Sequence, residues 1–188
     1  MVLYYICLLD KTTMALHITS TTKSVKQLRP TTRDELRLII KDELERQGPD
    51  ANLNHIDTSE ITSMSELFFD LDIRNIRIDR WDTSNVTCMF QMFRNCRNFN
   101  CDLSKWDTSK VESMSYMFYG CSEFKSDLSK WRTSKVESMA CMFYDCSEFE
   151  SDLSNWNISN VKTIYDMFFG CFKMTNDLRP NPYNSYPF

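Results

Sequence analysis

The chain has 188 residues and a mass of 22.3 kDa, with 42% hydrophobic residues, 26% charged residues and a formal net charge of −4. These values fit one folded domain, and the acidic balance argues against a general nucleic-acid binder, which needs a surplus of Lys and Arg. With only three glycines and two histidines, His17 and His55, the chain is poorly suited to glycine-rich phosphate loops or multi-histidine metal sites. No apolar run approaches the roughly 18 residues of a membrane span.

Residues 1–30 are predicted to form a flexible N-terminal arm, because Ser and Thr are frequent in its second half. The first nine residues are apolar, but no basic residue precedes them and an acidic residue, Asp10, follows at once. This pattern is a poor secretory signal, since it lacks both a positive start and a small-residue cleavage site. Translation starts at either Met1 or Met14 on this interpretation.

Residues 31–55 are predicted to form a capping helix and a linker. Thr32 and Glu35 have the spacing of a capping box, and an apolar stripe follows in steps of three and four residues. Gly48 stands where a C-terminal glycine of a helix belongs. The pattern predicts an amphipathic helix over 33–47, which would cover the apolar end of the region that follows.

From residue 56 to residue 178 the sequence repeats every 25 residues, and 179–188 is left as a C-terminal tail. Residues 106–130 and 131–155 agree at 19 positions and differ at 6. A fixed period of this length is typical of stacked arrays. We interpret the invariant positions as a structural ladder, formed by Trp81, Trp106, Trp131 and Trp156, by Cys96, Cys121, Cys146 and Cys171, and by Asp102, Asp127, Asp152 and Asp177.

Within one unit, the apolar residues from Val86 to Cys96 follow helical spacing. A Ser precedes this run, and in two units, as with Ser134 and Glu137, the spacing is that of a capping box. The segment around Leu103 is predicted to be a short strand. The sequence therefore predicts an α/β fold, a short leucine-rich-repeat-like solenoid of about five 25-residue units with an N-terminal capping helix.

The unit Trp-Asp-Thr-Ser-x-Val-x-x-Met-x-x-Met-Phe-x-x-Cys-x-x-Phe-x-x-Asp-Leu-Ser resembles the repeat of the BspA-like leucine-rich-repeat surface proteins, which also occur among mycoplasma lipoproteins. The resemblance covers about 56–178 and is clearest over 81–178. It implies a solenoid and a binding role, often at a cell surface and sometimes toward host matrix proteins. The resemblance implies no catalytic residues, because the family shares none.

The ladder residues have structural interpretations and functional alternatives. We expect the tryptophans to lie in the core and the ladder cysteines to be buried thiols, although disulfides involving Cys101 or Cys141 stay open, as does exposure of Cys88. The ladder aspartates could bind calcium together, but we expect each to accept hydrogen bonds from the backbone of its own turn.

Large side chains follow the Met-Phe pairs of successive units and form the best candidate for a binding site. Tyr and Arg are favoured in binding hot spots because they are large, amphipathic and rigid. The alternative is that these side chains pack between neighbouring helices. The candidate binding stripe consists of Arg94, Tyr116, Tyr119, Tyr144 and Phe169, with Tyr165 beside it.

We therefore expect a non-catalytic protein–protein interaction module, which the resemblance makes an adhesin-like surface binder. An intracellular interaction scaffold or effector and a calcium-dependent structural module stay open as alternatives. No Ser/His/Asp arrangement indicates an enzyme, and we expect no catalytic residues, no cofactor and no metal. The expected partner is a protein, without nucleic acid or an integral membrane segment, and the chain is expected to be a monomer. The resemblance places it at the cell surface or outside, and the weak N-terminal signal leaves an intracellular location open.

Overall fold

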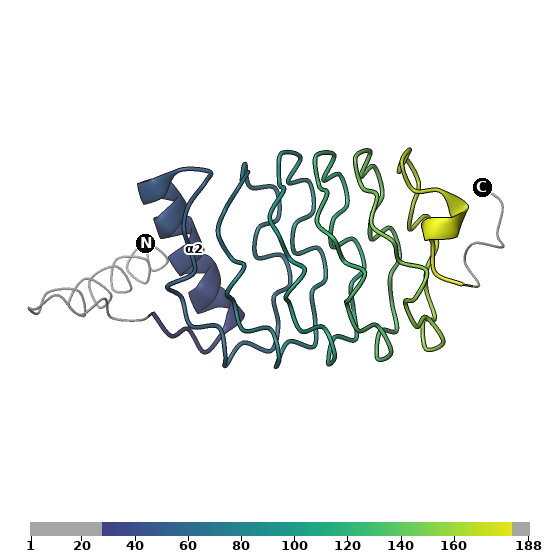
Figure 1. Cartoon of the computed structure of the whole chain (residues 1–188). Coiled ribbons are helices and arrows are strands. Elements are labelled where there is room, and N and C mark those ends of the chain that lie inside the picture. The colour runs from purple at the N-terminus through teal and green to yellow at the C-terminus, as the bar shows by residue number, and fades with distance from the viewer. Residues whose placement is uncertain (1–27, 182–188) are drawn as a thin grey trace, which may run out of the picture.

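The computed structural model describes residues 28–181, and the parts of the predicted arm and tail beyond them lie outside the described residues. Within this range the helices are α2 (Arg33–Gln47) and the short 3-10 helix η1 (Asn176–Leu178). The chain between them winds through a series of coils stacked side by side, with α2 at one end of the stack and η1 at the other (Figure 1).

Helix α2 confirms the helix predicted over 33–47. The Thr32 hydroxyl accepts a hydrogen bond from the Glu35 N–H at 3.2 Å, and the Glu35 carboxylate accepts one from the Thr32 N–H at 3.3 Å, so the capping box is complete. At the other end, Gly48 has a φ of 83° and its N–H donates to the Leu44 carbonyl at 2.8 Å. The helix thus begins and ends where its capping residues specify.

The prediction of an α/β leucine-rich-repeat-like solenoid is wrong. Within residues 28–181 the repeats contain neither a helix nor a strand before η1, and the coils pair only through isolated parallel bridges. The segment predicted as a helix is a run of tight turns. The N–H groups of Met92, Arg94 and Cys96 each donate to the carbonyl three residues earlier, at 3.3, 3.2 and 3.0 Å.

Left-handed residues explain why these segments are turns. Gln91 and Asn95 have φ angles of 55° and 64°, and a right-handed helix cannot continue through such residues. The same two positions are left-handed in all the remaining coils, at Glu66 and Asp70, Tyr116 and Gly120, Cys141 and Asp145, and Asp166 and Gly170. Outside glycine this conformation costs roughly 1–2 kcal/mol per residue, so other interactions must hold these turns in place.

Hydrogen bonds between coils provide that stabilisation, and those made by the turn segment itself run in one direction. In each coil except the last, four alternate N–H groups of this segment donate to four carbonyls of the next coil. In the third coil the pairs are Met114 to Ser138, Tyr116 to Ala140, Phe118 to Met142 and Gly120 to Tyr144, at 2.9, 2.9, 2.9 and 2.7 Å. Along this segment each coil therefore presents donors toward the C-terminal end of the stack, whereas two residues before the segment the bonds run the other way, as from the Glu137 N–H to the Glu112 carbonyl at 2.8 Å.

Columns of identical side chains fill the interior, which confirms the core prediction for the tryptophans and ladder cysteines. The Trp131 Nε1 donates to the Leu103 carbonyl at 3.0 Å, and the Cys146 thiol donates to the Phe118 carbonyl at 2.9 Å. The other ladder Trp and Cys side chains donate to the carbonyl 28 residues earlier in the same way. Each of these polar side-chain atoms is thus satisfied inside the core and ties its coil to the preceding one.

The aspartate ladder caps turns, as predicted, at three of its four positions. The carboxylates of Asp102, Asp127 and Asp152 accept hydrogen bonds from the N–H groups two residues later, at 2.9, 2.9 and 3.0 Å. Bonds from the following serines lower the pKa of each carboxyl, so these groups are held ionised in their turns. The fourth aspartate, Asp177, lies in η1.

The capping box offers a test of the difference between α2 and the repeats. We expect Thr32→Ala to lower the free energy of unfolding by about 1 kcal/mol, because the Glu35 N–H loses its acceptor. Ser134→Ala is the matched control. Ser134 has the same sequence signature but starts no helix and is exposed, so its loss should change the free energy by less than about 0.5 kcal/mol. Urea unfolding of both variants measures the contrast, and equal losses would contradict it.

Candidate binding surface

A column of large side chains runs along one side of the stack, directly after the core phenylalanines. Its members are Phe69, Arg94, Tyr119, Tyr144 and Phe169. The ring centroids of Tyr119 and Tyr144 lie 4.7 Å apart with an interplanar angle of 9°, and those of Tyr144 and Phe169 lie 4.8 Å apart with an angle of 18°. Equivalent residues of neighbouring coils lie one above the other, and so these rings stack.

Arg94 joins Phe69 to the stacked rings of this column. Its guanidinium carbon lies 5.6 Å from the ring centroid of Phe69 and 5.1 Å from that of Tyr119, and it also lies 5.6 Å from the ring centroid of Tyr116. A cation over ring faces at these distances is attracted by the electrons of the rings. The half-buried Arg94 side chain is therefore held among three aromatic neighbours, and the column is continuous across five coils.

A second group of rings lies beside the column. The Tyr116 hydroxyl is 3.1 Å from the Tyr165 hydroxyl, two coils further along the chain. The rings of Tyr116 and Phe90 are nearly perpendicular, at 81°, with their centroids 6.1 Å apart. The hydrogen bond with Tyr165, together with burial, raises the pKa of Tyr116, so the hydroxyl stays protonated at neutral pH. We call the whole set the aromatic stripe: Phe69, Phe90, Arg94, Tyr116, Tyr119, Tyr144, Tyr165 and Phe169.

The structure places all five predicted stripe residues in this one surface. The predicted alternative, in which they pack between helices, does not apply because the repeats contain no helix. Sequence reasoning missed Phe69 and Phe90. Counting 25 residues back from Arg94 finds Phe69. Phe90 has the same position in the repeat as Tyr165, but Ser115 and Ala140 stand between them, so the aromatic signal is interrupted.

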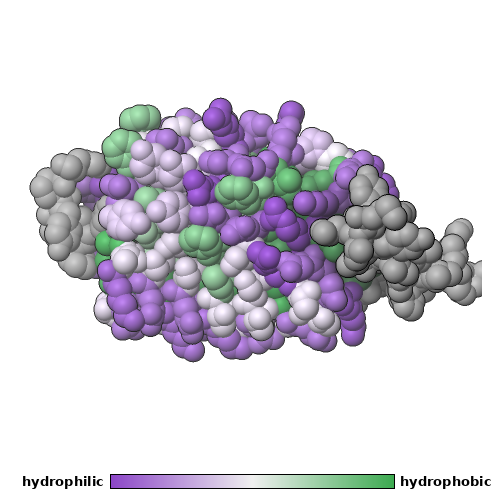
Figure 2. Space-filling model, turned by 180° about the vertical axis from the view of Figure 1, so that it is seen from behind, coloured by the Kyte–Doolittle hydropathy of each residue, from purple (hydrophilic) through white to green (hydrophobic). Residues whose placement is uncertain are grey.

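The stripe is partly accessible to a partner. Tyr165 and Phe169 are 56% and 57% exposed, and the other stripe residues are half-buried. In the view of the stack in Figure 2, hydrophilic side chains predominate and apolar ones form small, separate patches. An unbroken run of stacked rings is a different kind of surface, because it offers a large apolar area that is already ordered.

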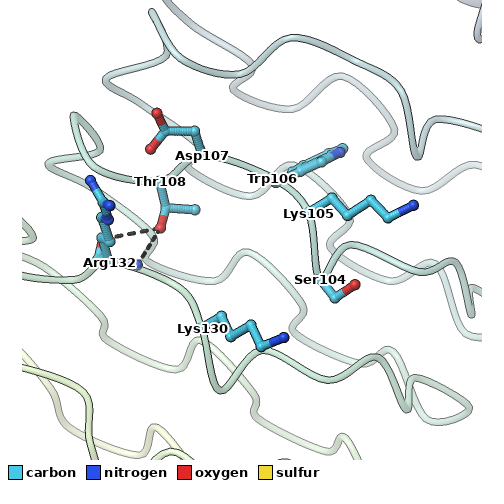
Figure 3. A pocket seen from close by; sticks show the side chains of 7 residues that line it. All are labelled: Ser104, Lys105, Trp106, Asp107, Thr108, Lys130 and Arg132. Carbon is cyan, nitrogen blue, oxygen red and sulfur yellow. Dashed lines mark hydrogen bonds between the residues drawn. The ribbon is translucent and has the colours of Figure 1, made fainter.

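A shallow hollow beside Trp106 is a second, weaker candidate (Figure 3). It lies between two coils that are joined where the Thr108 hydroxyl donates to the Arg132 carbonyl and accepts from the Arg132 N–H, at 3.0 and 2.8 Å. Its lining consists of Ser104, Lys105, Trp106, Asp107, Thr108, Lys130 and Arg132. These groups offer positive charge but no paired acid and base, and so they indicate no reaction.

The cysteines of the described residues are free thiols, and most of them are buried. All seven cysteines within residues 28–181 are free, and Cys88 is half-buried while Cys101 and Cys141 are buried. Among the same residues, no three His, Cys, Asp or Glu side chains are grouped so that they could hold a metal ion. The thiols of the core are therefore best explained by their hydrogen bonds to the preceding coil.

The buried thiol of Cys96 should make the stability of the fold depend on pH. Burial raises the pKa of Cys96 from an ordinary value of 9.0 to about 12. As the pH rises above 9, the Cys96 thiol loses its proton in the unfolded chain before it does so in the folded protein. Ionisation therefore stabilises the unfolded state, and the free energy of unfolding should fall. For Cys96 the slope should be about 1 kcal/mol per pH unit near pH 10–11. Urea unfolding over this range should give a shallower slope for Cys96→Ala than for the wild type, and equal slopes would contradict the assignment.

The sequence matches one family model, described as "Mycoplasma protein of unknown function, DUF285", over residues 43–140 and again over 101–184. The two matches overlap and together cover more than half of the chain. The chain belongs to the DUF285 family. No curated protein and no solved structure matches the sequence. The DUF285 matches include the coils that carry the aromatic stripe and the hollow. Within residues 28–181, this DUF285 chain has no helix with the length and apolar character that crossing a membrane requires.

Proposed function

We propose that this DUF285 protein is a non-catalytic protein-binding module that contacts its partner through the aromatic stripe. The observation that carries the proposal is the continuous stacking of Tyr119, Tyr144 and Phe169, extended through Arg94 to Phe69. Tyr and Arg are enriched among the residues that dominate binding energy. Because the stacked rings are already fixed, little side-chain entropy is lost when a partner covers them.

The resemblance to BspA-like surface proteins supports an adhesin-like role with a host matrix protein as the partner. The charges beside the stripe favour a partner with basic residues. Asp70 and Asp145 each follow a residue of the column directly, and Asp166 directly follows Tyr165 of the stripe. All three side chains are exposed. A partner that brings Lys or Arg side chains next to apolar ones would match both the carboxylates and the rings.

The test is binding of the purified full chain to immobilised fibronectin, laminin and collagen, followed by biolayer interferometry. We expect Tyr144→Ala to weaken binding to the recognised protein by about tenfold, since truncation of a hot-spot tyrosine removes more than about 1 kcal/mol. Lys135→Ala is the control, because Lys135 is exposed and lies outside the stripe. Equal binding by Tyr144→Ala and the wild type would contradict a role for the stripe. Binding to none of the three proteins would contradict the adhesin-like role.

An intracellular interaction scaffold that uses the same stripe is the second candidate. The observation that favours it is that the seven described cysteines are free thiols, as expected in a reducing compartment. The intact mass of the protein from its native source, measured with and without alkylation after unfolding, separates the two candidates. Alkylation of every thiol would favour the intracellular scaffold, and oxidised cysteines would favour export.

A further inference from the structure

Basic side chains occupy one position of the repeat in three successive coils. Arg80, Lys105 and Lys130 each directly precede a ladder tryptophan, and all three are exposed. Bridges between the repeats join residues 25 apart in sequence, so equivalent positions are neighbours along the stack, about 5 Å apart at the backbone. Figure 3 shows the side chains of Lys105 and Lys130 extending in the same direction, and the exposed Arg132 lines the same hollow. We call these four residues the basic row.

The cations of the basic row have no partner within residues 28–181. None of the four side chains makes a hydrogen bond or an ion pair there. Lysines elsewhere on the coils differ in this respect. Lys125 and Lys173 each pair with Glu148, at 3.3 and 2.7 Å, and Lys162 pairs with Glu137 at 2.8 Å. The basic row therefore keeps its N–H donors available for a ligand.

The carboxylates near the basic row are engaged by other groups. Each of the five acidic residues within three positions of the row accepts a hydrogen bond, four of them from the N–H group two residues later and one from an asparagine side chain. The distances lie between 2.7 and 2.9 Å, and the residues are Asp79, Asp82, Asp102, Asp107 and Asp127. These bonds offset part of the negative charge at each carboxylate, whereas no bonded carboxylate offsets the charge of the row.

An anionic polymer that lies along the stack would match this arrangement, because it would meet one cation in each of three coils. At about 0.1 M salt, charges more than about 10 Å away are largely screened. Such a polymer would therefore respond to the basic row more than to the net charge of −4.

The lining of the hollow restricts the class of polymer. Trp106 is its only aromatic residue, is 4% exposed, and stacks on Trp81 at a centroid distance of 6.4 Å. Single-stranded nucleic acids stack their bases on accessible rings, and the hollow offers none. It also has no exposed apolar side chain that could anchor a protein. A polar polymer that carries anionic groups fits the lining better than either.

We propose that the basic row binds a sulfated polysaccharide. Sulfate groups would accept charge-assisted hydrogen bonds from the lysine ammonium groups and from the arginine guanidinium groups. The basic row shares no residue with the aromatic stripe, so this site is additional to the protein-binding surface.

Calorimetric titration of the full chain with heparin, in about 50 mM NaCl to limit screening, tests the proposal. Lys105→Ala combined with Lys130→Ala should weaken binding about tenfold, because two surface ion pairs are lost. Lys105→Arg combined with Lys130→Arg keeps both charges and should bind as the wild type does. The matched control is Lys110→Ala combined with Lys135→Ala, which removes two exposed lysines that are also 25 residues apart. This control should change binding by less than about twofold.

Several results would overturn the proposal. They include a wild type that does not bind heparin, and equal weakening in the two alanine double variants, since binding would then follow net charge alone. Heparin stripped of its sulfate groups should bind at least about tenfold more weakly, and undiminished binding would mean that sulfate is not recognised. Single-stranded DNA that binds as tightly as heparin would assign the row to nucleic acid instead. Tyr144→Ala should leave heparin binding unchanged, so failure of this proposal is distinguishable from failure of the aromatic stripe.

Discussion

Replacing Trp131 with alanine should lower the free energy of unfolding by about 3–5 kcal/mol. The side chain is 4% exposed, and its ring stacks on that of Trp156 at a centroid distance of 6.4 Å and approaches that of Phe118 at 6.2 Å. Its Nε1 donates to the Leu103 carbonyl at 3.0 Å. The substitution therefore opens a cavity between two coils and also removes one of the two hydrogen bonds to the Leu103 carbonyl, which keeps the bond from the Trp106 N–H. Urea unfolding measures the loss.

A second variant separates the two contributions of Trp131. Trp131→Phe keeps much of the ring volume but removes Nε1, so it should cost less than the alanine variant while still removing the hydrogen bond from the side chain to the Leu103 carbonyl. Equal losses for the two variants would mean that the hydrogen bond dominates. A midpoint of unfolding unchanged in Trp131→Ala would contradict the core position of the ring.

Phe118→Ala should destabilise the protein by a similar amount, about 3–5 kcal/mol. The Phe118 ring is fully buried, and its centroid lies 5.6, 4.2 and 5.5 Å from those of Phe93, Phe124 and Phe143. The matched control is Phe172→Ala, because Phe172 is 86% exposed and its truncation should cost less than about 0.5 kcal/mol. Thermal unfolding of both variants tests the contrast, and comparable losses would mean that the column is not what holds neighbouring coils together.

The apolar spacing within each repeat predicted the buried residues correctly but the local backbone wrongly. Val86, Met89, Met92, Phe93 and Cys96 are all buried, as their helical spacing predicts. Consecutive three-residue turns also return the chain to one side every three or four residues, so the same spacing fits both structures. What separates them is the left-handed backbone at Gln91 and Asn95. Glutamine is not a residue type that signals this conformation, which is imposed here by bonds to the next coil.

The 25-residue repeat predicted those residues of the aromatic stripe that recur at the same position in successive units. It did not predict the residues whose position is occupied by other residue types in other units. Tyr119, Tyr144 and Phe169 could be placed together from the 25-residue spacing alone. The hydrogen bond between Tyr116 and Tyr165 links positions that are not equivalent in the repeat, so it needed the structure. Helix α2 was predictable because its signals are local, with the capping box and Gly48 at its two ends.

The register of the hydrogen bonds between coils has a consequence for how such proteins can change in length. Every bond of the ladder joins residues separated by a constant offset, as from Trp131 to the Leu103 carbonyl or from Phe118 to the Met142 carbonyl. Loss or duplication of 25 residues keeps each donor opposite an equivalent acceptor, whereas loss of 24 misaligns every column beyond the cut. Length can therefore vary only in whole coils, and each added coil extends the outer surface by one more row of side chains.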